Sequence, residues 1–153
     1  EAGASLCALA DFFEKRGDNG RAAELRAKAI ACDSPDATCV SDEAYKYEQR
    51  GDYVTARRMY EQSLQLQPND AELITNYAIF LDETANKNKT QLSLAGNLYR
   101  QAIKLGPYHP TYYGNYATYL SLAGDFAAAR QYYEIAANFP YCDAASLCGY
   151  AVF

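Results

Sequence analysis

Residues 42–68 read DEAYKYEQRGDYVTARRMYEQSLQLQP and predict two helices joined by a tight turn. Gly51 can take the left-handed backbone conformation that ends a helix, and the Asp52 carboxylate can then accept hydrogen bonds from the free amides that open the next one. From Ala56 onward, small and large residues recur at helical spacing on one face, and Pro68 prevents the second helix from continuing. The segment is therefore predicted to be one helix-turn-helix unit.

The same unit recurs along the chain. Alanines at equivalent positions of the first helix recur at intervals of 34, 34, 39 and 34 residues, and alanines of the second helix recur at 34, 39 and 34. Small residues let two helices approach closely, so both series predict the seam between stacked helices. The first series is Ala10, Ala44, Ala78, Ala117 and Ala151, and the second is Ala22, Ala56, Ala95 and Ala129.

Larger residues keep the same register. Three second helices carry a tyrosine four residues after their alanine, and a proline closes each unit. With this period and these small, aromatic and proline positions, the sequence resembles the tetratricopeptide repeat (TPR) family. The resemblance implies an all-α fold, a right-handed α-solenoid of about four helix-turn-helix units plus a fifth first helix. The tyrosines are Tyr60, Tyr99 and Tyr133, and the prolines are Pro35, Pro68, Pro107 and Pro140.

One solenoid domain is expected over residues 1–153. The third unit differs from the others, because its two alanine positions lie 17 residues apart where the other units have 12. Surface turns absorb extra length at low cost, so the five additional residues are expected to form a polar loop over residues 84–90. The expected units are 3–36, 37–70, 71–109 with this insertion, 110–143 and a partial unit over 144–153.

Composition excludes several classes of partner. The chain has 153 residues, of which 50% are hydrophobic, so it can bury a core. Its formal net charge is −5 with no run of Lys and Arg, which disfavours nucleic acid and anionic membranes. No apolar run approaches the roughly 18 residues that span a bilayer, so no membrane insertion is expected. The family resemblance favours a soluble, cytoplasmic location, and an extracellular location is the alternative.

The five cysteines do not form a metal site. They contain no CxxC pair, and His109 is the single histidine, so a zinc site has too few ligands. Reduced, partly buried cysteines are one interpretation. The other is a pair of short disulfides, Cys32 with Cys39 and Cys142 with Cys148, each across a turn between helices.

The sequence carries no catalytic arrangement. His109 lies in a turn beside prolines, and no nucleophile or carboxylate pattern accompanies it. No glycine-rich phosphate loop follows a strand. The protein is therefore predicted not to be an enzyme and to need no cofactor. Asn88 begins the sequon Asn-Lys-Thr, which is a possible glycosylation site and favours the extracellular alternative.

The TPR resemblance implies a binding groove lined by the first helices. The projected lining is acidic and lacks the cations with which some family members hold C-terminal carboxylates, so a basic or neutral peptide is the expected partner. Asn76 and Asn115 share one position in successive units and resemble the asparagine ladder of the N-acetylglucosaminyl protein transferase, although solvated polar residues are an alternative interpretation. The predicted partner groove consists of Asp42, Tyr45, Glu48, Glu72, Asn76, Glu83 and Asn115.

The last residues predict a second surface. Residues 146–153 read SLCGYAVF and are almost wholly apolar, which is unsuitable for a solvent-facing cap. Either the chain belongs to a longer array or another molecule covers this face. The alternative function is therefore a structural subunit that stacks head to tail into a filament or tube, possibly extracellular and glycosylated. The predicted assembly face is Leu147, Tyr150 and Phe153, and the surplus among the fifteen tyrosines also favours an interface.

Overall fold

The computed structural model describes residues 2–139. The chain forms two compact units, Glu1–Pro68 and Asn69–Phe153. Every regular element among the described residues is an α-helix, so the all-α fold class is confirmed. The division falls within two residues of the predicted boundary at residue 70, and the prediction of a single domain over the whole chain stays a prediction. None of the described helices combines the length and the apolarity that a bilayer crossing requires.

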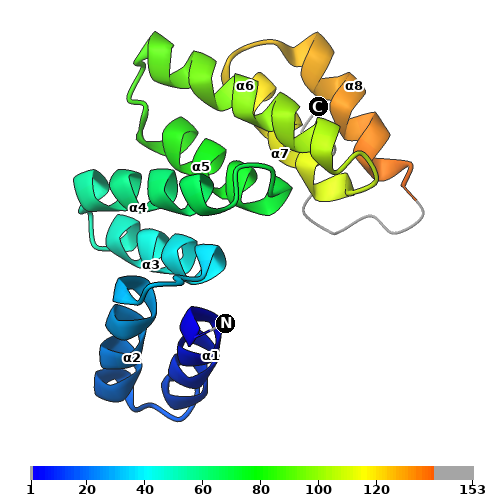
Figure 1. The fold of residues 1–153 in the computed structure, drawn as a ribbon. Helices are drawn as coiled ribbons and strands as arrows, with labels where there is room; N and C mark the ends of the chain where they lie inside the picture. Colours follow the sequence, from blue (N-terminus) through cyan, green and yellow to red (C-terminus); the bar gives the residue numbers. More distant parts are fainter. Residues whose placement is uncertain (1, 140–153) are drawn as a thin grey trace. The chain divides into compact units, whose positions relative to one another are not determined.

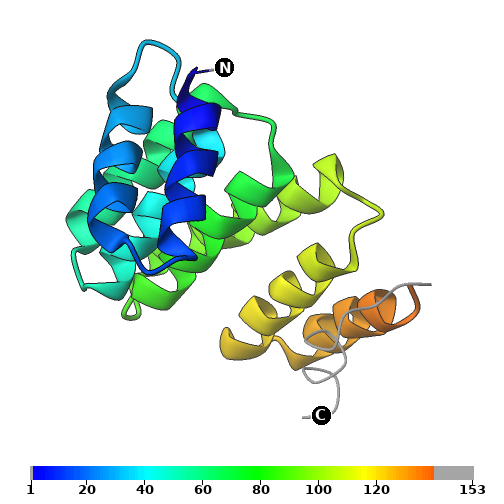
Figure 2. The same cartoon turned by 90° about the horizontal axis from the view of Figure 1, so that it is seen from below.

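The first unit consists of two helical hairpins. Helix α1 (Ala2–Glu14) packs along α2 (Asn19–Ala31), and α3 (Ala37–Gln49) packs along α4 (Tyr53–Leu66). Helix α3 also contacts both α1 and α2. Figures 1 and 2 show α1 and α2 side by side and antiparallel, as the short turn between them requires.

The second unit repeats the hairpin arrangement. Helix α5 (Ala71–Thr84) packs along α6 (Lys89–Leu105), and α7 (Pro110–Leu122) packs along α8 (Phe126–Ala137). Helix α7 contacts α6 and α5 (Figure 1). The predicted helix-turn-helix organisation is therefore confirmed for the described residues.

Three of the turns within hairpins have the predicted chemistry. Their glycines, Gly17, Gly51 and Gly124, have φ of 83°, 80° and 87°, which a residue with a Cβ rarely adopts. An aspartate follows each glycine, and its carboxylate accepts a hydrogen bond from the amide three residues later, as Asp52 does from Thr55. The turn predicted at positions 51 and 52 is confirmed, and the same turn recurs one repeat earlier and two repeats later.

The two alanine series form the helix seams. All eight alanines that fall among the described residues are at most 3% exposed. The tyrosines four residues after the second-helix alanines are also buried: Tyr60, Tyr99 and Tyr133 are 2%, 2% and 3% exposed. The seam prediction is confirmed for these residues, and Ala151 lies outside the described part of the chain.

The insertion in the third unit does not form the predicted loop. Helix α6 begins six residues before Ala95, whereas α2, α4 and α8 begin three residues before their equivalent alanines. Most of the extra length is therefore helical, and only Ala85 to Asn88 separate α5 from α6. The reason is capping, because the Asn88 side chain accepts hydrogen bonds from the amides of Thr90 and Gln91 and starts the helix early.

Candidate partner-binding surface

The predicted groove residues of α3 divide into two groups. Asp42 and Tyr45 are exposed, and Tyr45 shows 55% of its surface to solvent. Glu48 is only 9% exposed, and its carboxylate accepts a hydrogen bond of 2.9 Å from the Tyr60 hydroxyl. The prediction that Glu48 lines the groove is wrong, because four residues after Ala44 it shares the face of α3 that packs on α4.

The predicted residues of α5 and α7 are accessible. Glu72 and Glu83 are exposed near the two ends of α5, and Asn76 lies between them and is half-buried. Asn115 on α7 is also half-buried. The surface of the second unit therefore presents carboxylates and amides from first helices. Peptide binding by the two asparagines stays a prediction.

Carboxylates in and beside α5 affect the pKa values of neighbouring groups. Burial raises the pKa of Tyr112, and the charges of Glu72 and Asp70 raise it further. Burial also raises the pKa of Asp82, with a smaller contribution from Glu83. In both groups burial is the larger cause and the neighbouring carboxylates the smaller one, so the acidic groove stays a prediction.

A buried arginine organises the first unit. Arg26 occupies the position that is tyrosine in the other second helices, and it is 4% exposed. Its guanidinium donates to Asp11 at 2.6 Å and also to Glu14, and the Lys46 ammonium lies 2.9 Å from Glu14. The hydrogen bond from Lys46 lowers the pKa of Glu14 against the opposing effect of burial, and Arg26 lowers it further. These ion pairs connect α1, α2 and α3.

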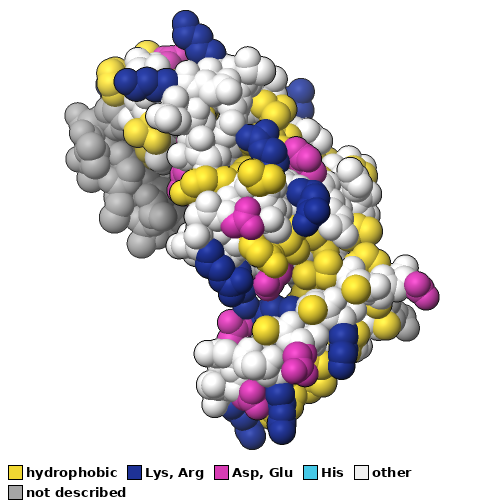
Figure 3. Space-filling view, turned by 90° about the vertical axis from the view of Figure 1, so that its left-hand side faces the viewer, with side chains coloured by type: hydrophobic (Ala, Val, Ile, Leu, Met, Phe, Trp, Pro, Cys, Tyr) yellow, Lys and Arg dark blue, Asp and Glu magenta, His cyan; other side chains and the backbone are white. Residues whose placement is uncertain are grey.

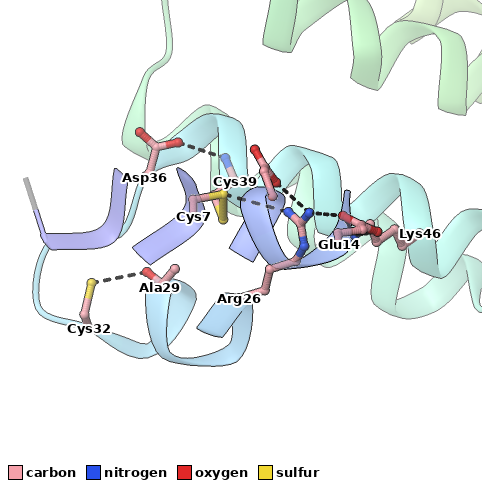
Figure 4. The surroundings of a disulfide bond; sticks show 9 residues. Cys7, Glu14, Arg26, Ala29, Cys32, Asp36, Cys39 and Lys46 are labelled. Carbon is pink, nitrogen blue, oxygen red and sulfur yellow. Dashed lines mark hydrogen bonds and ion pairs between the residues drawn. A yellow bond between two sulfur atoms is a disulfide. The ribbon is translucent and has the colours of Figure 1, made fainter. Parts of the chain in front are cut away.

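A disulfide joins the first helices of the first two repeats. Cys7 on α1 and Cys39 on α3 are bonded, with Cα atoms 6.0 Å apart (Figure 4). The predicted pair of Cys32 with Cys39 is therefore wrong. Cys32 follows the end of α2 and is a free thiol that donates to the carbonyl of Ala29 at 3.2 Å.

The sequence contained a signal for the observed pairing. Cys7 and Cys39 are 32 residues apart, which is close to one repeat period, and residues one period apart on first helices stack against each other. Both sulfurs lie in a buried cluster with Ala29. A search by repeat register rather than by proximity in sequence would have selected this pair. Cys142 and Cys148 lie outside the described residues.

Most tyrosines of α7 serve helix packing. Tyr116 packs edge-to-face on Tyr132 with ring centroids 4.7 Å apart, and Tyr99 lies 5.6 Å from Tyr119. Tyr113 packs on Phe139 at 5.4 Å. These contacts hold α6, α7 and α8 together and account for much of the aromatic surplus that the sequence shows.

Solved structures match this fold, whereas no family model and no curated protein matches the sequence. The structure of Pseudomonas aeruginosa pilF matches 97% of this chain with a TM-score of 0.74 and 21% identity, and this chain spans 65% of its length. The first TPR of Spaghetti (RPAP3), solved with an HSP90 peptide, matches 80% of this chain and 94% of its own, with a TM-score of 0.65 and 18% identity. MamA matches 99% of this chain and 81% of its own, with a TM-score of 0.70 and 14% identity.

The chain has the tetratricopeptide repeat fold. The resemblance that the alanine, tyrosine and proline positions indicate is therefore confirmed at the level of fold, and the architecture is that of a TPR solenoid.

His109 has no catalytic setting in this TPR fold. It is exposed, and its ring stacks on Tyr112 with centroids 4.6 Å apart. Within residues 2–139, no group of three or more His, Cys, Asp or Glu side chains could hold a metal ion. The prediction that the protein is not an enzyme stays a prediction.

The sequon lies at an accessible position. Asn88 is exposed and caps α6 through its side-chain oxygen, which leaves the side-chain nitrogen as the attachment point for a sugar. Glycosylation of Asn88 stays a prediction. The predicted assembly face of Leu147, Tyr150 and Phe153 lies outside the described residues.

Charge is mixed over the surface drawn in Figure 3. Lys and Arg side chains alternate there with Asp and Glu and with hydrophobic groups. Binding to a phosphate backbone depends on clustered cations, and this face shows no continuous basic patch. The prediction that nucleic acid is not a partner concerns the whole surface and stays a prediction.

Proposed function

We propose that this chain is a non-catalytic TPR scaffold that mediates protein-protein interaction and assembly through the first-helix surface of its repeats. The fold supports this proposal, because TPR structures include one solved with a bound peptide, the Spaghetti TPR with the HSP90 peptide SRMEEVD. That peptide is acidic. The first-helix surface of α5 instead exposes the carboxylates Glu72 and Glu83, so we infer a partner segment of different charge at this surface.

The observation that carries the proposal is the arrangement of polar groups on α5. Glu72 and Glu83 are 11 residues apart, which is about 16 Å along a helix, and Asn76 lies between them. An extended peptide covers this distance in about five residues. The carboxylates would pair with cationic side chains, and the amide can both donate to and accept from a peptide backbone. We therefore infer that the partner is a basic or neutral extended segment.

A labelled peptide with two lysines five residues apart tests the proposal by fluorescence anisotropy. The double variant Glu72→Lys with Glu83→Lys should bind the peptide about tenfold more weakly or worse, because two favourable charge pairs become repulsive. Glu24→Lys is the matched control, since Glu24 is an exposed carboxylate on a second helix. Equal affinity of the double variant and the wild-type chain would contradict the proposal.

The buried disulfide indicates the cellular compartment in which the protein acts. Structural disulfides form and persist in oxidising compartments, and Cys7 and Cys39 are 9% and 0% exposed. The exposed sequon at Asn88 points in the same direction. We therefore propose that the scaffold acts outside the reducing cytosol, which reverses the weak preference that the family resemblance gives.

A further inference from the structure

A cleft of about 340 Å³ lies between α6 and α7. Its α6 side is one stripe of residues along the helix, and its α7 side includes an aromatic ring and an aliphatic side chain. The lining includes Lys89, Ser93, Gly96 and Arg100 from α6 and Tyr119 and Leu120 from α7. No residue of α5 lines this cleft, and it has no assigned role in the proposed function.

The charged groups of the cleft are both cations. Lys89 and Arg100 line its two ends, and both are exposed. They are 11 residues apart on one helix, which corresponds to about 16 Å. No carboxylate lines the cleft, although the chain as a whole carries a net charge of −5. The lining therefore favours an anionic occupant.

Tyr119 forms the aromatic part of the wall between the cations. The Tyr119 hydroxyl donates a 2.9 Å hydrogen bond to the Leu92 carbonyl, which fixes the ring against α6. Gly96 makes this approach possible, because a Cβ at that position would lie 2.8 Å from the hydroxyl oxygen. Burial, followed by the charge of Asp82, raises the pKa of Tyr119, so the donor stays protonated. A ligand would meet a preformed surface.

The charge pattern of this cleft differs from that of the first unit. The equivalent cleft of the first unit is lined by Arg26, Glu43 and Lys46, which carry both signs. In repeat register, Glu43 corresponds to Tyr116 and Lys46 to Tyr119. Lys89 has no counterpart within the shorter helices, because it belongs to the extra turn with which α6 begins. The early start of α6 thus places one of the two cations on the helix.

We propose that the cleft between α6 and α7 binds a short extended acidic segment of a partner protein. Two carboxylates five residues apart would reach Lys89 and Arg100, since extended chain rises about 3.3 Å per residue. Apolar side chains between them would lie on Tyr119 and Leu120. The scaffold then has two peptide sites of opposite charge preference on different faces of its helices.

Fluorescence anisotropy with the full chain tests this inference. The probe is a fluorescein-labelled peptide Glu-Ala-Leu-Ala-Leu-Glu, and the comparison is the same composition with adjacent carboxylates, Glu-Glu-Ala-Leu-Ala-Leu. The spaced peptide should bind more tightly. The double variant Lys89→Gln with Arg100→Gln should lower the affinity for the spaced peptide about tenfold, because two partly exposed charge pairs are lost. Lys104→Gln, at an exposed cation on α6 that does not line the cleft, should leave affinity unchanged.

A second variant separates the cleft from general electrostatics. Ser93→Trp fills the cleft without changing charge and should abolish binding of the spaced peptide, while circular dichroism confirms that the helices remain folded. Equal binding of the two peptides, or an equal loss of affinity in the double variant and in Lys104→Gln, would overturn the proposal. Binding of the basic peptide without binding of the acidic one would refute this inference and leave the proposed function intact.

Discussion

Two buried charged residues of the first unit make ion pairs or hydrogen bonds between helices. Arg26 replaces a tyrosine and recruits two carboxylates that a groove projection would assign to the solvent-facing surface. Glu48 is similar, since its charge suggests exposure and the Tyr60 hydroxyl draws it inward. Sequence position gave the correct helix for each residue. The spacing of Glu48 from Ala44 also indicates the face of α3 that packs on α4, but the charge of Glu48 argued for exposure and its hydrogen-bond partner Tyr60 lies on another helix.

The disulfide makes a residue-level prediction. Replacing Cys7→Ser and Cys39→Ser should lower the free energy of unfolding by about 3 to 4 kcal/mol, because the bond closes a loop of 32 residues in the unfolded chain. Urea denaturation followed by circular dichroism measures the change. Cys32→Ser is the control and should have little effect, since that thiol makes one hydrogen bond. An equal loss in the control would show that the bond is not the source of stability.

At the scale of helices, the sequence predicted hairpins well because each carries its own boundary signals. The glycine and aspartate pairs mark the turns of three hairpins, and alanine spacing fixes the register of both helices. The third repeat lacks the glycine and uses Asn86 and Lys87 with φ of 42° and 70°. The alanine spacing correctly predicts five extra residues in this repeat. It does not predict that most of them are helical, because the Asn88 cap starts α6 early and competes with loop formation.

That cap makes an element-level prediction. Asn88→Ala should lower the free energy of unfolding by about 1 kcal/mol, because the amides of Thr90 and Gln91 lose their acceptor. Thr90→Ala is the matched control, since it removes the sequon and keeps the cap. If Asn88 carries sugar, mass spectrometry of the natively produced protein should show the same loss of mass in both variants. Equal stability of Asn88→Ala and the wild-type chain would contradict the role of the cap.

At the scale of the whole molecule, the alternative function depends on the terminal apolar segment. Leu147→Asp with Tyr150→Asp should abolish any concentration-dependent assembly, because charge would be placed on a surface that needs an apolar partner. Sedimentation velocity at rising concentration measures the size distribution. An open series of sizes that disappears in the variant would favour the filament or tube. Unchanged assembly would remove the terminal segment as the docking face.

The central claim is that first helices of this TPR fold hold a basic or neutral segment of a partner. Hydrogen exchange of the full chain, with and without the two-lysine peptide, tests that claim most directly because it reports which helices the peptide covers. Amide exchange should slow over α5 and α7 when the peptide binds, and the double variant Glu72→Lys with Glu83→Lys should reduce this protection. Protection confined to second helices, or no protection while the peptide is bound, would contradict it.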